Sequence, residues 1–123
     1  MSIEPYSTTV RQLFDDPRHT GSLEAATIAA IDDQGMRIEL SAEQSGGVVQ
    51  KLRFRAWGCP HFIAAAEAFC AAYEGRPVAD LGLFAAAELM QSLPVPVEKT
   101  GRILVIEDAV RALGTGLREA SPS

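Results

Sequence analysis

Alternating hydrophobic and polar residues along two neighbouring stretches of the chain predict a pair of β-strands. Apolar residues take every second position from Met36 to Ala42, and Gln44–Gly47 forms a turn rich in small residues before the second stretch. The residues expected to point inward on the second strand are Val48, Gln50, Leu52, Phe54 and Ala56. Two alternating strands joined by a short glycine-containing turn are typical of an antiparallel hairpin. The outward set is Val49, Lys51, Arg53 and Arg55, and its basic members are expected to face Glu39 and Glu43.

Apolar residues spaced three and four positions apart predict helices on both sides of this hairpin. The predicted helices cover Pro5–Phe14, His61–Tyr73, one or two short segments within Val78–Ser92, and Ile103–Leu117. On the second of these, Cys70 falls on the apolar stripe and is expected in the core. The remaining segments are a weakly extended stretch at Leu23–Ile31, a turn at Asp32–Gly35, an extended proline segment at Leu93–Val97 and a loop at Glu98–Arg102.

The order of these elements predicts the fold class. Strands that come first and helices that come afterwards favour an α+β fold, in which helices pack on one face of a small antiparallel sheet of about three strands. A chain of 123 residues, of which 47% are hydrophobic, is expected to form one domain over residues 1–123.

Charge and composition narrow the functional classes. A net charge of −5 argues against binding to nucleic acid or to an anionic membrane surface. No apolar run is long enough for a membrane span and no signal peptide is visible, so a cytoplasmic protein is expected. The two cysteines, Cys59 and Cys70, would lie about 16 Å apart along one helix, which is too far for a disulfide. The chain has no glycine-rich phosphate loop, His-Glu-x-x-His motif or serine elbow, and we expect no enzyme activity.

The candidate chemistry centres on Cys59. The sequence Trp57–Gly58–Cys59–Pro60 predicts the end of a strand, a glycine turn and the start of a helix, with Pro60 as the first helical residue and Cys59 as the N-cap. A sulfur at that position would face the first free N–H groups and the positive end of the helix dipole, and both favour the thiolate. Cys59 is therefore either a reactive or metal-binding cysteine, or a small buried residue that closes the corner.

Several motifs, taken in order, resemble the iron–sulfur cluster assembly scaffolds of the IscU family and the N-terminal domain of NifU. The likeness runs from Tyr6 to about Ala112. The motifs that carry it are Tyr6–Phe14, Asp16–Arg18 with Gly21–Glu24, Phe54–Cys59 with Ile63–Ala66, Leu93–Val97 with Lys99, and Glu107–Ala112. The resemblance implies an IscU/SufE-like fold and a role in iron–sulfur cluster assembly.

The ligand set of that family is only partly present. Its members hold a [2Fe–2S] cluster or a metal ion with three cysteines and an aspartate or histidine. The place of the first cysteine is taken by Asp32–Gln34, and the third falls on Gly101–Arg102, so only Cys59 remains. Because one thiolate cannot hold a cluster that needs about four donors, the fold carries over more firmly than the chemistry.

Three functions follow from this pattern. In the first, Cys59 accepts persulfide sulfur from a cysteine desulfurase, or acts as one ligand of a transient iron–sulfur cluster. In the second, Cys59 with Asp32 or Asp33, joined by His61 or His19, binds a single zinc or iron ion, and a second chain could complete the site in a homo-oligomer. In the third, the chain is a non-catalytic, regulatory partner of the assembly machinery.

The proline segment implies one further partner by resemblance. The family offers a similar Leu-Pro-Pro-Val-Lys stretch to an Hsp70-type chaperone. The corresponding residues are Leu93, Pro94, Val95, Pro96, Val97 and Lys99. The alternative is that two prolines between helices form only a rigid connector.

Overall fold

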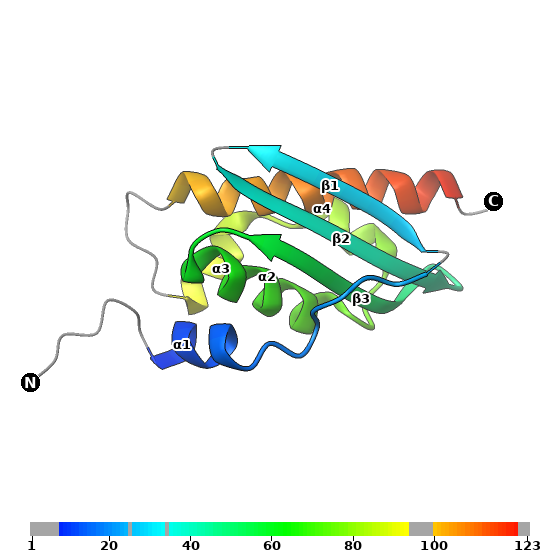
Figure 1. The fold of residues 1–123 in the computed structure, drawn as a ribbon. Helices are drawn as coiled ribbons and strands as arrows, with labels where there is room; N and C mark the ends of the chain where they lie inside the picture. Colours follow the sequence, from blue (N-terminus) through cyan, green and yellow to red (C-terminus); the bar gives the residue numbers. More distant parts are fainter. Residues whose placement is uncertain (1–7, 25, 34, 94–99, 121–123) are drawn as a thin grey trace, which may run out of the picture.

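The computed structural model describes residues 8–24, 26–33, 35–93 and 100–120, and within them it has the predicted α+β architecture (Figure 1). Three strands form one antiparallel sheet in the order β1-β2-β3, as predicted. The elements in chain order are α1 (Thr8–Asp15), β1 (Thr27–Asp33), β2 (Met36–Ser45), β3 (Val48–Trp57), α2 (Pro60–Tyr73), the 3₁₀ helix η1 (Val78–Leu83), α3 (Ala86–Ser92) and α4 (Thr100–Ala120).

The helices cover one face of the sheet. Helix α4 packs against β1 and β2, α2 packs against β3, and α1 packs against α2 (Figure 1). The predicted apolar stripes of α2 and α4 are buried, and Phe54, Phe62 and Phe69 are among the largest side chains in the core. Each such side chain contributes about 1.5–3 kcal/mol when it leaves water, so this layer supplies most of the stability.

Two predicted boundaries near the candidate site are wrong. Asp32 and Asp33 belong to β1 and not to a turn, because strand pairing continues until Asp33 lies opposite Met36. The connection to β2 is therefore short, and its Gly35 has a φ of +75°, which suits glycine. Helix α4 begins at Thr100, so Gly101 and Arg102 lie in its first turn and not in a loop.

A β-bulge reverses part of the predicted pattern on β3. Lys51 pairs with Glu43 and Val49 pairs with Gln44, so Gln50 is an extra residue without an opposite partner in the register. The extra residue shifts the alternation by one position. Val49 is consequently buried and Gln50 exposed, the reverse of what strict alternation predicts.

The segment between α1 and β1 closes the free edge of β3. Phe54 donates its N–H to the carbonyl of His19 at 2.8 Å, and Gly21 donates its N–H to the carbonyl of Phe54 at 2.8 Å. The chain then reaches the outer face of the sheet, where the Leu23 N–H donates to the Ser41 hydroxyl at 3.1 Å. One edge of the sheet and part of its uncovered face are thereby protected from solvent.

A buried carboxylate on α2 holds this segment in place. Glu67 Oε1 accepts the backbone N–H groups of Arg18 at 2.6 Å and His19 at 2.7 Å, and Oε2 lies 2.5 Å from His19 Nδ1. The side chain of Glu67 is only 4% exposed, and that of His19 is 18% exposed. The His19 ring, which the sequence offers as a possible metal donor, is thus engaged by a carboxylate almost 50 residues away in the sequence.

Replacing Glu67 tests how much this anchor contributes. Glu67→Ala leaves two backbone N–H groups and the His19 ring without their carboxylate acceptor, and we expect the free energy of unfolding in urea to fall by about 3 kcal/mol. Asp108→Ala, which removes an exposed carboxylate from α4, is the control and should change it by less than about 0.5 kcal/mol. Equal effects of the two substitutions would show that Glu67 is not an anchor.

Candidate functional site

The strand–turn–helix corner at Cys59 has the predicted backbone. Cys59 is the N-cap of α2, with φ −76° and ψ 162°, and Pro60 follows at the start of the helix. The Cys59 carbonyl accepts the N–H groups of Phe62 at 3.0 Å and Ile63 at 3.1 Å. Cys59 is partly buried, packs against the edge of the core and is not in a disulfide.

One part of the predicted stabilisation of the thiolate is absent. The Cys59 side chain makes no capping hydrogen bond to the first N–H groups of α2, and the Phe62 N–H is accepted by the Cys59 backbone carbonyl instead. The sulfur keeps its position at the positive end of the helix dipole, which is the part of the prediction that depends only on location.

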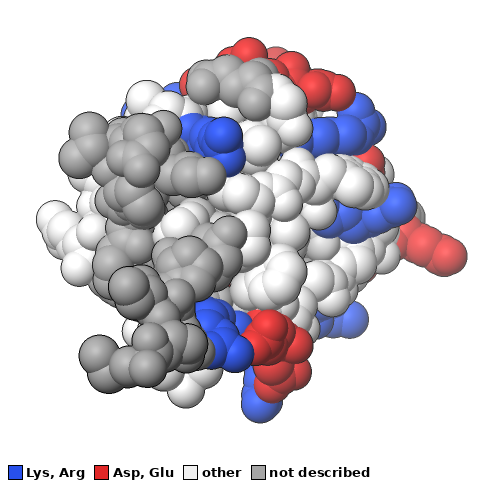
Figure 2. All heavy atoms as spheres, turned by 60° about the vertical axis from the view of Figure 1, so that its left-hand side comes forward, with Lys and Arg blue, Asp and Glu red and all other residues white. Residues whose placement is uncertain are grey.

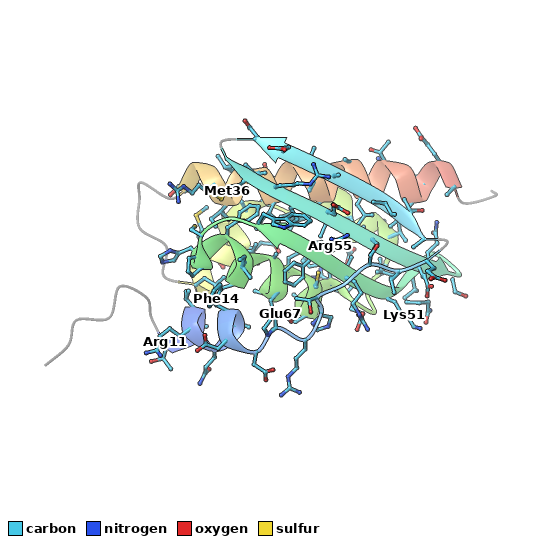
Figure 3. The ribbon with its side chains drawn as sticks, in the orientation of Figure 1. Arg11, Phe14, Met36, Lys51, Arg55 and Glu67 are labelled. Carbon is cyan, nitrogen blue, oxygen red and sulfur yellow. The ribbon has the colours of Figure 1, made fainter. Side chains whose placement is uncertain are left out.

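Gly58 sets the shape of this corner. A Cβ atom at Gly58 would clash with the Met36 sulfur and would lie 3.1 Å from the Phe62 ring. Met36, at the start of β2, is itself nearly buried and lies at the same end of the molecule as the β1–β2 connection and the first turn of α4 (Figures 1 and 3). A larger residue at position 58 would push Met36 or the start of α2 away, and Cys59 with it.

The two candidate aspartates lie on opposite faces of the sheet. Asp33 shares its row and its face with Met36, on the side of the helices. Asp32 is on the outer face, where its Oδ2 lies 3.7 Å from Arg37 Nη1. Both residues are exposed, and only Asp33 is on the side of the sheet that carries Cys59.

The other predicted donors are not brought to Cys59 as a ligand set. His19 is bound to Glu67 at the edge of β3, and His61, in the first turn of α2 next to Cys59, is only 3% exposed. Within the described ranges, no group of three or more His, Cys, Asp or Glu residues could hold a metal ion. The described residues of one chain therefore do not fit a [2Fe–2S] cluster, which needs about four donors.

Cys70 is a core residue, as predicted. Its side chain is fully buried, and burial raises the pKa of the Cys70 thiol well above its usual value, with further contributions from the nearby Glu67 and Glu74 carboxylates. A protonated thiol without access to solvent cannot act as a nucleophile or a metal ligand. Any thiolate chemistry of the described residues belongs to Cys59.

The basic and acidic residues predicted to face each other across the hairpin do lie on opposite strands in register, but they form ion pairs with other partners. Arg55 lies opposite Glu39 and Lys51 opposite Glu43. Glu39 instead pairs with Arg37 at 3.3 Å, and Arg53 reaches Glu74 on the other side of the β3 edge at 2.6 Å. Burial tends to raise the pKa of Glu74, but hydrogen bonds from the Leu52 N–H and from Arg53 lower it overall.

Sequence reasoning missed the surroundings of Trp57. The guanidinium carbon of Arg37, on the neighbouring strand β2, lies 5.6 Å from the centre of the indole ring. The guanidinium carbon of Arg55, two residues earlier on β3, lies 5.2 Å from the same centre. Strand alternation alone places Trp57 and Arg55 on the same face, but only the β2–β3 register brings Arg37 opposite Trp57.

This combination of a three-stranded antiparallel sheet, a helical layer and a cysteine at the start of α2 defines an α+β domain of the iron–sulfur scaffold type. The sequence model of the NifU-like N terminal domain matches residues 5–114, and the chain belongs to that family. The described residues contain no helix of the length and apolarity that crossing a membrane requires.

Individual relatives agree with this assignment. The chain is 24% identical over 115 residues to Iron sulfur cluster assembly protein 1, mitochondrial, of Eremothecium gossypii, which covers 87% of this chain and 75% of that protein. The protein of the same name from Kluyveromyces lactis is 23% identical over 115 residues, again 87% of this chain and 64% of its own length.

Solved structures share the fold. The N-terminal part of a NifU-like protein from Brucella abortus superposes with a TM-score of 0.75 at 14% identity, covering 94% of this chain and 95% of that one. A proposed iron–sulfur cluster assembly scaffold protein for the SUF system from Fervidobacterium islandicum gives a TM-score of 0.70 at 12% identity, with coverages of 87% and 94%. At these identities the superpositions confirm the predicted fold.

Alkylation should distinguish the two thiols. In the folded protein at neutral pH, we expect iodoacetamide to modify Cys59 roughly 100-fold faster than Cys70, because Cys70 reacts only when the core opens. Peptide mass spectrometry locates the adduct, with Cys59→Ser and Cys70→Ser as matched controls. Comparable rates at the two positions, or no reaction at Cys59, would contradict the assignment.

Proposed function

We propose that the protein acts in iron–sulfur cluster assembly as an acceptor of sulfur at Cys59. The observation that carries the proposal is the partly exposed Cys59 thiol at the N-terminus of α2, in a chain of the NifU-like N terminal domain family. A single thiolate is sufficient for such a step, whereas the donors among the described residues do not support a cluster. The protein is a carrier in this scheme and not an enzyme.

The transfer is a thiol exchange. The Cys59 thiolate attacks the outer sulfur of a persulfide on a cysteine desulfurase, a new S–S bond forms at Cys59, and the desulfurase cysteine leaves as a thiolate. The outer sulfur moves without net oxidation or reduction. Both cysteines of this chain are free, which fits the reducing conditions of a cytoplasm-like compartment.

A second candidate is a partner-binding homologue that neither accepts sulfur nor holds a cluster. It is favoured by Arg102 at a family ligand position and by the lack of a metal-binding group among the described residues. A homologue of this kind would bind the desulfurase equally well in the wild type and in the Cys59→Ala variant. Its wild-type chain would acquire no sulfur from the desulfurase. A mononuclear zinc or iron site on Cys59 and Asp33 would require further ligands from a second copy or a partner.

Sulfur transfer can be tested directly. After incubation with a cysteine desulfurase and cysteine, we expect the mass of one sulfur atom to be added to Cys59 in the wild type and in Cys70→Ser. Cys59→Ser should show no addition, because Cys70 is buried.

The absence of an adduct would refute the proposal, above all if anaerobic reconstitution with iron, sulfide and thiol also gave no visible absorbance. Absorbance in the wild type that is lost in Cys59→Ser would instead support cluster binding shared between chains.

The proline segment gives a separate prediction about an Hsp70-type chaperone. Leu93 is buried in the core, and residues 94–99 lie outside the described residues. A peptide spanning 93–99 should therefore bind the chaperone more tightly than the folded chain does, because the folded chain must first expose Leu93. Fluorescence anisotropy with a scrambled peptide as control would measure this, and equal binding of the scrambled peptide would end the proposal.

A further inference from the structure

The two edges of the sheet differ in how they are covered. Strand β3 forms one edge and β1 forms the other, since β2 lies between them. The edge of β3 is paired with other segments at two points, where Thr20 bridges Phe54 and Pro77 bridges Val48. On the other edge, no hydrogen bond joins the backbone of Thr27–Asp33 to any described segment except β2. The described part of the chain therefore closes one edge and leaves the other open.

The open edge of β1 presents a row of unpaired main-chain groups. In an antiparallel pair every second residue directs its N–H and C=O away from the neighbouring strand, so the seven residues of β1 offer both donors and acceptors. Figure 1 shows β1 along the outer margin of the sheet, with α4 behind it. Ile28 is 56% exposed, and Ala30, Asp32 and Asp33 are exposed as well. Open edges are commonly protected by a proline, a lysine or a bulge, and β1 has none of these.

An edge of this kind takes an extended strand, because only another strand satisfies a row of alternating N–H and C=O groups. The sequence of β1 suits pairing with β1 of a second copy. Antiparallel pairing about a two-fold axis at Ala30 places Asp32 opposite Ile28 of the second copy, and Asp33 opposite Thr27 of the second copy. No carboxylate then faces another one directly, which would be destabilising.

The position of the acidic residues favours this direction of pairing. Both aspartates of β1 are at its C-terminal end, and Figure 2 shows acidic side chains at the top of the molecule, where the β1–β2 connection lies. Parallel pairing of two β1 strands would bring these ends together, with Asp32 beside its own counterpart. Antiparallel pairing separates them to the two ends of the interface.

We propose that the chain forms a symmetric dimer in which β1 pairs antiparallel with β1 of a second copy, so that the two sheets become one continuous sheet. Each copy uses the same surface, as a closed two-fold interface requires. Residues along a strand are about 3.3 Å apart, so Asp33 would lie roughly 20 Å from the Asp33 of the other copy. Asp33 pairs with Met36, which packs against the Cys59 corner, so the two thiols would lie at opposite ends of the interface. The proposal goes beyond sulfur transfer, and each can fail without the other.

The strength of the association follows from the size and charge of the interface. One strand pair buries less surface than a permanent dimer does, so we expect dimers at high micromolar to millimolar protein concentration. Each chain carries a net charge of −5, and added salt should strengthen the dimer because it screens this repulsion. Sedimentation velocity measures the association, and hydrogen exchange of the β1 amides should slow as the protein concentration rises.

Cysteine cross-linking tests the register. In a Cys59→Ser background, Ala30→Cys places two thiols opposite each other at the two-fold axis, within reach of a disulfide. Asp32→Cys is the matched control, because it is exposed on the same face of the same strand but its counterpart would lie roughly 13 Å away. Under mild oxidation with diamide, we expect Ala30→Cys to form the covalent dimer about tenfold faster than Asp32→Cys.

Two added lysines test the interface in the absence of a cross-link. Ala30→Lys puts two like charges opposite each other at the axis and should weaken the association about fivefold. Gln50→Lys makes the same change in net charge at an exposed position on β3, and should alter the association less than about twofold.

Several results would overturn the proposal. They are a monomer over the whole concentration range, cross-linking at position 32 as fast as at position 30, and equal effects of the two lysines. Slow exchange of the β1 amides in the dilute monomer would also overturn it, because another segment of the same chain would then cover the edge.

Discussion

The junction between β3 and α2 is the constraint on which the arrangement of this molecule depends. The chain passes from a strand into a helix within three residues, and the space for this turn is limited by Met36 and Phe62 around Gly58. Pro60 supplies the first helical φ angle without needing a hydrogen-bond acceptor. The same junction places Trp57 on the outer face of the sheet and Cys59 at the start of α2.

The position of α2 is held at several points along its length. Phe62 and Phe69 lie in the core, and Glu67 ties the segment after α1 to the middle of the helix. That segment is in turn hydrogen-bonded to Phe54 on β3. Because β3 and α2 are anchored to a common third element, the turn at Gly58 is restrained from both sides. A buried carboxylate with several donors is a suitable anchor, since its loss would leave those donors unpaired.

The sequence predicts the sheet, the helices and the corner at Cys59, because these depend on local periodicity and on the preferences of glycine and proline. It could not predict the bulge at Gln50, where Lys51 and Val49 pair with consecutive residues of β2. The His19–Glu67 contact is equally out of reach, since it joins residues far apart in the chain. At the candidate site, the sequence identifies Cys59 but not that Asp32 and Asp33 point to opposite faces, which follows only once both are placed within β1.

The charges of the described residues near Cys59 fit the proposed sulfur transfer better than they fit the binding of a metal cation. Arg102 lies in the first turn of α4, at the end of the molecule where α2 begins, and Asp32 forms an ion pair with Arg37 (Figure 1). A cation bound near Cys59 would meet this positive charge without enough carboxylates or thiolates to offset it. A persulfide is itself an anion and needs only one sulfur on the accepting chain. The small number of donors that the described residues bring together is therefore compatible with the proposed sulfur transfer.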